Sequence, residues 1–155
     1  ADMYVLAQIG GTELAGGTDP FVMAKAATYL ALQNGLRIDD DSRPMVFGRV
    51  QDSIDRGLPF MWVCRAGGPT EKWISEWTDR RKKTEWADWV AFVKSRPPLH
   101  QAIDGGGHMR MIVGYNAQTH EVAISDSWGS KFVERWLPYD VFEQLTQGLV
   151  YTIKW

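Results

Sequence analysis

Two apolar runs joined by a short polar turn dominate the second half of the chain. The runs are residues 109–115, which follow three glycines and His108, and residues 122–126, which end at Asp126. This pattern predicts a hairpin of two buried strands, with His108 entering one strand and Asp126 leaving the other. A turn centred on Ala117 would place the two residues opposite each other, with Cβ atoms roughly 5 Å apart. An imidazole beside a carboxylate is oriented and made more basic, as a general base requires.

Each member of this pair also has a purely structural interpretation. His108 could end the loop formed by the preceding glycines, and Asp126 could form a turn before Ser127 and Gly129. A register slip of one residue would place the two side chains on opposite faces of the sheet. The mirrored positions favour a catalytic pair, and so do the glycines, because glycine lets a ligand approach the imidazole closely.

Hydrophobic spacing and turn residues predict the other elements. The tail of a helix is expected in residues 1–12. A full helix is expected to begin at Thr18 or Asp19, either of which can cap it, with Pro20 in its first turn, and to end near Gln33. Further helices are expected over residues 47–55, twice within 70–95 with a break near Lys82, and over 138–145. Strands are expected over residues 36–38, 59–64, 132–136 and 149–155. Helices followed by mostly antiparallel strands predict an α+β fold.

Length and charge exclude several classes of protein. The 155 residues suit a single domain, residues 1–155, with a sizeable core. A net charge of −2 argues against a general nucleic-acid binder. The one basic cluster, Arg80 to Lys83, is flanked by acidic residues and is expected to be a solvated helix end rather than a phosphate site. No apolar run approaches the roughly 20 residues that a membrane span needs.

The chain offers a general base more clearly than a nucleophile. Cys64 is the single cysteine, so no internal disulfide can form, and it ends an apolar strand without a helix N-terminus to activate it. We therefore expect a structural thiol. No Gly-x-Ser-x-Gly turn signals a serine nucleophile. His100, Asp104 and His108 have the spacing of one helix face, but the glycines between them argue against a helix, so neither a metal nor a cofactor is expected.

Residues 66–100 differ from the rest of the chain in their tryptophan content. Trp73, Trp77, Trp86 and Trp89 recur at three- and four-residue steps among charged residues. This spacing predicts two amphipathic helices that pack on the core, with a lid or a partner surface as the alternative. We interpret the segment as a helical insertion.

Two segments resemble a known family. Residues 107–116 and 122–129 resemble the His and Asp segments of papain-like cysteine peptidases. They are most similar to the branch of bacteriocin-processing, double-glycine-leader peptidases and their bacterial relatives. Residues 17–20, 54–63 and 138–142 are similar to other segments of that branch, so the resemblance covers most of the chain outside 66–100. It implies a papain-like α+β fold with N-terminal helices packed on a mostly antiparallel sheet.

The resemblance also implies roles for individual residues. His108 would be the general base, Asp126 would orient it, and Gly106, Gly107 and Trp128 would line the peptide-binding groove. Arg110 departs from the family's usual apolar residue and could pair with a carboxylate or disturb the base.

The nucleophile of that family has no match in this sequence. The family's cysteine opens a core helix, and residues 1–9 resemble the segment after that helix, so the cysteine is expected upstream of Ala1. The chain is then either a fragment of a longer peptidase-like protein or a member of a lineage that lost the nucleophile. We favour the fragment, because a missing core helix would leave an apolar face of the sheet uncovered.

Three functions follow from these observations. The first is a cysteine hydrolase that cleaves a peptide bond in its full-length form, this chain alone being inactive. The second is a non-catalytic peptide-binding module, and the third is catalysis by Cys64 and His108 within the chain. The expected partner is a peptide or protein substrate, and no nucleic acid is expected. The compartment and the oligomeric state stay open, and export of the full-length form is compatible with the resemblance.

Overall fold

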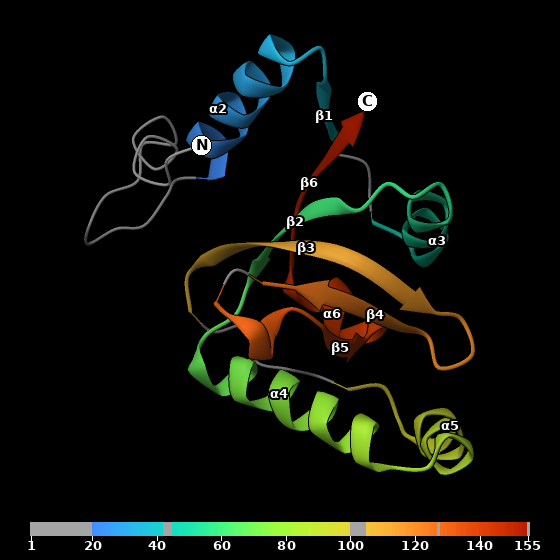
Figure 1. The fold of residues 1–155 in the computed structure, drawn as a ribbon. Coiled ribbons are helices and arrows are strands. Elements are labelled where there is room, and N and C mark those ends of the chain that lie inside the picture. The colour runs from blue at the N-terminus through green and yellow to red at the C-terminus, as the bar shows by residue number, and fades with distance from the viewer. Residues whose placement is uncertain (1–19, 42–44, 100–104, 127, 155) are drawn as a thin grey trace.

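The computed structural model describes residues 20–41, 45–99, 105–126 and 128–154 (Figure 1). The expected helix tail in residues 1–12, the caps Thr18 and Asp19, and the pair His100 and Asp104 lie outside the described residues. The helices are α2 (Pro20–Gln33), α3 (Phe47–Asp55), α4 (Gly68–Lys83), α5 (Trp86–Ser95) and α6 (Tyr139–Leu145), with a short 3-10 helix at Ser130–Phe132. The strands are β1 (Arg37–Asp41), β2 (Phe60–Arg65), β3 (Gly107–Asn116), β4 (Glu121–Ser125), β5 (Arg135–Pro138) and β6 (Thr146–Lys154).

The strands form one sheet in the order β1-β6-β2-β3-β4-β5, and every neighbouring pair is antiparallel. Helix α2 contacts the β1 end of this sheet, whereas α4 runs beside β5 at the other end (Figure 1). The expected α+β class with a mostly antiparallel sheet is therefore confirmed.

The helix predictions are confirmed where the structure describes them. Helix α3 spans the expected residues, and the Trp-rich segment forms two helices with a break after Lys83. Helices α2 and α3 are each followed by a glycine at φ +71°, Gly35 and Gly57. Glycine adopts this left-handed conformation without the steric cost that a Cβ atom brings, which is why these two positions end helices.

The prediction of a strand over residues 132–136 was wrong in extent. Only β5 is a strand there, and its buried residues are Arg135, Leu137 and Pro138. Trp136 is half-buried, with the guanidinium of Arg81 lying 3.9 Å from its ring centroid. Hydrophobic alternation misplaced this strand because a buried arginine occupies an inward position.

The main core lies on one face of the sheet. Phe60 and Trp62 of β2 pack there with Ile112 of β3 and Ile124 of β4. Helices cover this face with the side chains Val50 of α3, Ile74 of α4, and Val141, Phe142 and Leu145 of α6. A smaller apolar cluster on the other face of β2 and β3 centres on Val63.

Helix α4 also completes the edge strand β5. The hydroxyl of Thr78 accepts a hydrogen bond from the backbone N–H of Trp136 at 2.9 Å and donates to its carbonyl at 3.2 Å. An exposed strand edge invites pairing with other chains, and this contact covers it.

Trp77 of α4 and Trp89 of α5 anchor these helices to a buried carboxylate. Glu121 of β4 is fully buried and accepts hydrogen bonds from the indole N–H groups of Trp77 at 2.8 Å and Trp89 at 3.1 Å. Thr119 donates at 2.6 Å and Arg81 at 3.2 Å to the same carboxylate. Trp77 and Trp89 pack on the body of the protein, as predicted, rather than forming a free lid, whereas Trp86 is 42% exposed. The interpretation of residues 66–100 as an insertion stays a prediction.

Replacing Glu121 by Gln tests this anchor. The amide keeps the shape but removes the charge and half of the acceptor capacity, so Arg81 and one indole lose their partner. We expect the free energy of unfolding to fall by about 3 kcal/mol, the scale of breaking a buried ion pair. Urea unfolding followed by tryptophan fluorescence measures it. The exposed Glu76→Gln is the control, expected to change stability by less than ~0.5 kcal/mol, and equal effects of the two variants would contradict the prediction.

Candidate functional site

The register of the β3–β4 hairpin differs from the expected one. Asn116 pairs with Glu121 and Tyr115 with Val122, so the turn spans residues 117–120 and is not centred on Ala117. The side-chain oxygen of Asn116 fixes this turn by accepting hydrogen bonds from the backbone N–H groups of Gln118 and Thr119, each at 3.0 Å. The predicted direct opposition of His108 and Asp126 was therefore wrong.

A β-bulge at Val113 nevertheless places His108 and Asp126 on the same face of the sheet. The pairing shifts by one residue between Ile112 and Gly114, after which Ile112 faces Ile124 and Met111 faces Ser125. One further step would put Arg110 opposite Asp126, with His108 as its diagonal neighbour. Without the bulge, the pairing set by the turn would place His108 and Asp126 on opposite faces.

The imidazole and the carboxylate meet across this diagonal. The Nε2 atom of His108 lies 3.0 Å from Oδ1 of Asp126. The Asp126 side chain is fully buried, whereas 25% of the His108 side chain is exposed. Within the described part of the chain, Nδ1 of His108 has no hydrogen-bond partner. An Nε2–H that donates to Asp126 leaves the lone pair on Nδ1, on the partly exposed imidazole.

Trp128 covers one face of the imidazole. The two ring centroids lie 4.5 Å apart at an interplanar angle of 24°. Trp128 itself is 49% exposed. An aromatic ring stacked on the imidazole keeps water from one side of the His108–Asp126 contact and offers an apolar surface to a ligand.

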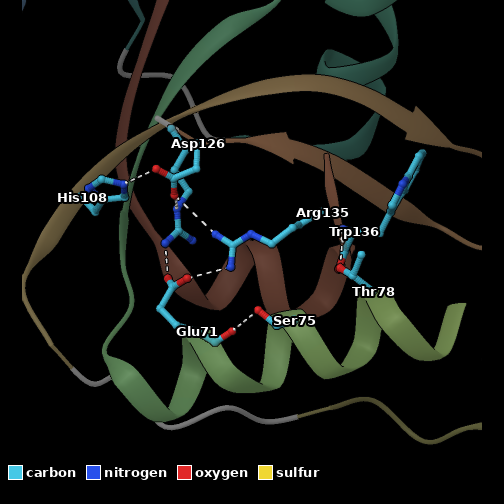
Figure 2. A network of polar contacts seen from close by, with 8 residues as sticks. Glu71, Ser75, Thr78, His108, Asp126, Arg135 and Trp136 are labelled. Atoms are coloured by element: carbon cyan, nitrogen blue, oxygen red, sulfur yellow. Dashed lines mark hydrogen bonds and ion pairs between the residues drawn. The ribbon is translucent and has the colours of Figure 1, made fainter. Parts of the chain in front are cut away.

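Two buried arginines hold the second oxygen of Asp126. Its Oδ2 accepts hydrogen bonds from Nε of Arg110 at 2.9 Å and from Nη2 of Arg135 at 3.4 Å. Glu71 in the first turn of α4 bridges the same arginines: Oε2 accepts from Nη1 of Arg135 at 2.8 Å, and Oε1 from Nη2 of Arg110. Figure 2 shows Glu71 reaching from α4 toward Arg135 and Asp126, with His108 on the far side of Asp126. The sequence-based alternative that Arg110 pairs with a carboxylate is thus confirmed.

The charges of this cluster balance while His108 is neutral. Two carboxylates, Glu71 and Asp126, face two guanidiniums, Arg110 and Arg135. A balanced cluster is what burial of charged groups requires, because an unpaired buried charge carries a large desolvation cost. Asp126 is thus compensated by the guanidiniums of Arg110 and Arg135 at one oxygen and contacts His108 with the other.

Cys64 lies directly across from His108 but does not have the properties of a nucleophile. The two residues are paired on strands β2 and β3, and the thiol points to the backbone carbonyl of His108 at 3.6 Å. Burial raises the pKa of Cys64 to about 12, and the opposing effect of the nearby Arg110 does not offset it. The thiol is therefore protonated at neutral pH and shielded from reagents.

The glycines before His108 have different environments. Gly105 has φ +77°, and a Cβ atom there would lie 2.6 Å from the backbone of Gly67, at the start of α4. This glycine is required by the fold itself. Gly106 and Gly107 are exposed, and a Cβ atom on Gly106 would meet nothing within 4 Å. The space beside Gly106 is open to a ligand, whereas a Cβ atom on Gly107 would lie 3.4 Å from Oε1 of Gln147.

Sequence reasoning missed Glu71 and Arg135. Glu71 is one of several acidic residues around a basic helix, and its own sequence context does not distinguish it. Arg135 could have been found from its spacing, because it alternates with the apolar Leu137 on the inward face of β5.

Metal binding and membrane insertion can be checked across the described residues. In the described ranges, no group of three or more His, Cys, Asp or Glu side chains is arranged to hold a metal ion. None of the described helices has the length and hydropathy needed to cross a bilayer.

The burial of Cys64 gives a direct chemical prediction. Iodoacetamide at neutral pH should leave Cys64 unmodified in the native protein and label it fully in denaturant, because only the thiolate reacts. Mass spectrometry of the intact chain measures both states. Rapid labelling of the native protein would contradict the protonated, shielded thiol and would revive the pairing of Cys64 with His108 as a catalytic unit.

The chain was compared with known proteins by sequence and by structure. No protein-family model matches the chain, and no curated protein matches its sequence. Among solved structures, it is similar to the peptidase domain of Streptococcus ComA, a bifunctional ABC transporter involved in a quorum-sensing pathway. The TM-score is 0.57 at 12% sequence identity, and the match covers 99% of this chain and 78% of that one. The chain thus shares the α+β fold of a peptidase domain.

Proposed function

We propose that the chain carries the general base and the orienting carboxylate of a hydrolase that cleaves peptide bonds by a cysteine mechanism. The observation that carries this proposal is the 3.0 Å contact between Nε2 of His108 and Oδ1 of Asp126. The similarity in fold to a peptidase domain supports it.

The geometry suggests how the base would act. With Nε2–H donating to Asp126, Nδ1 of His108 would take the proton of a thiol, and the thiolate would attack the carbonyl carbon of the substrate. The same nitrogen would then return the proton to the leaving amine as the tetrahedral intermediate collapses. Gly106, Gly107 and Trp128 lie beside His108, and we assign to them contact with the peptide.

The thiol in this mechanism is not Cys64. Its buried, protonated sulfur and its contact with a backbone carbonyl exclude thiolate attack at neutral pH. The proposal therefore places the nucleophile in residues encoded upstream of Ala1, as the family resemblance implies. This chain by itself should not hydrolyse peptides.

The experiment is a peptidase assay of the protein carrying its encoded upstream segment. His108→Ala should lower kcat/KM by roughly 10²–10⁴-fold, the usual contribution of a general base. His120→Ala, in the turn at the other end of the hairpin, is the matched control. We avoid substitution of Asp126, because its loss would leave two guanidiniums with one carboxylate and would cost about 3–5 kcal/mol of stability.

Two results would contradict the catalytic proposal. One is hydrolysis at an unchanged rate in His108→Ala, and the other is an encoded upstream segment that contains no cysteine. A thiol-reactive probe gives an independent check, because it should label the upstream cysteine and leave Cys64 unmodified.

The second candidate function is peptide binding without catalysis. The observation that favours it is the exposed ring of Trp128 beside open space at Gly106, in a chain whose single thiol is buried. The test is calorimetric titration with a synthetic peptide that contains a Gly-Gly step. A binding module should keep its affinity in His108→Ala and lose about tenfold or more in Trp128→Ala, because an aromatic anchor contributes on the order of 2 kcal/mol. Equal affinity of the two variants would contradict this function.

A further inference from the structure

Helix α4 is connected to the candidate general base through a closed ring of ion pairs. Asp126 contacts Arg110 and Arg135, and both arginines contact Glu71 in the first turn of α4. The ring is nearly sealed from solvent, since the exposed fraction of its side chains is 17% for Glu71 and 2% or less for the others. Figure 2 shows the arrangement from Glu71 through Arg135 and Asp126 to His108.

The two carboxylate oxygens of Asp126 have different partners. Oδ2 faces the two guanidiniums, at 2.9 Å from Arg110 and 3.4 Å from Arg135, which leaves Oδ1 for His108. A rotation of the carboxylate would break bonds to two buried cations before it released the imidazole. Charge-assisted hydrogen bonds are the stronger class in proteins, so this arrangement restrains the carboxylate.

We infer that Glu71, Arg110 and Arg135 are positioning residues for His108: they hold the carboxylate of Asp126 in the orientation that presents Oδ1 to the imidazole. Helix α4 would thereby set the geometry of the base. The catalytic meaning of this inference rests on the proposed function, whereas the orientation itself can be measured without any activity.

The hydrogen-bond inventory of the arginines favours positioning over a purely stabilising role. Nη1 of Arg110 and Nε of Arg135 are buried and lack a hydrogen-bond partner among the described residues. A buried N–H donor without a hydrogen-bond partner lowers the stability of the fold. A cluster whose only role is to stabilise the fold would therefore be expected to give every such donor a partner. Buried ion pairs are also often no more stabilising than apolar residues of similar size. The donors that are satisfied are those that bridge Glu71 to Asp126.

The test observes the Nε2–H proton of His108 by NMR in ¹⁵N-labelled protein. In the unaltered chain, donation to Asp126 should protect this proton from solvent exchange, so its resonance should be visible at neutral pH. Glu71→Asp keeps the charge but shortens the side chain by one methylene, so the carboxylate can no longer reach both arginines. The exchange rate of the proton should then rise by about tenfold or more, and the resonance should broaden or disappear.

Glu76→Asp is the matched control on the same helix, where the exposed side chain pairs, among the residues that the structure describes, only with Lys72 at 3.8 Å. It should leave the His108 resonance unchanged. Glu71→Asp should fold, because aspartate is favoured in the first turn of a helix, and circular dichroism checks that it does. Arg135→Lys is the second variant: it keeps the charge but loses the planar fork that bridges two carboxylates, and should have the same effect.

An unchanged resonance in either folded variant would overturn the inference, as would a missing resonance in the unaltered protein. A role in stability alone predicts a lower unfolding temperature with the resonance retained. The proposed function fails by a different result, the absence of peptidase activity in the protein with its upstream segment. That result would not change the interpretation of the NMR measurement.

Discussion

Asp126 lies between a partly exposed imidazole and two buried guanidiniums, and much of the surrounding architecture follows from the need to compensate these charges. Two arginines on the covered face of a sheet, Arg110 and Arg135, carry more positive charge than one aspartate can balance. A second carboxylate must therefore come from outside the sheet, and α4 supplies Glu71. Without the helix docked at this place, the cluster would hold an uncompensated buried charge.

The other half of α4 is held by the same kind of interaction. Trp77 and Arg81 donate to the fully buried carboxylate of Glu121 on β4, and Thr78 pairs with the free edge of β5. The helix is thus anchored by buried polar contacts at both ends, with Ile74 packed on the core between them. Directional contacts of this kind fix the position of a helix more closely than an apolar stripe does. A fixed α4 keeps Glu71 in contact with Arg110 and Arg135.

Under the proposed cysteine mechanism, this arrangement separates the two parts of the site. The proposed base, His108, lies on β3, and Asp126 directly follows β4, with Nε2 of His108 at 3.0 Å from Oδ1 of Asp126. The thiol across from them, Cys64, is part of the packed core and has a pKa of about 12. Among the described residues, Nδ1 of His108 has no hydrogen-bond partner, and the imidazole lies beside Trp128 and the exposed Gly107.

The amino-acid sequence by itself determined the local features of this protein: the helices with their terminal glycines, the hairpin, the α+β class, and His108 and Asp126 as a candidate pair. These features depend on residue spacing and turn chemistry within short segments. The hairpin register did not follow from the sequence, because a bulge at Val113 offset the unexpected position of the turn. The link from Asp126 through Arg110 and Arg135 to Glu71 of α4 depended on the tertiary structure. Glu71 and Arg135 are 64 residues apart, and only the docking of α4 beside β5 brings them together. Charge compensation in a buried cluster is a property of the assembled elements, so no periodicity within any one of them can encode it.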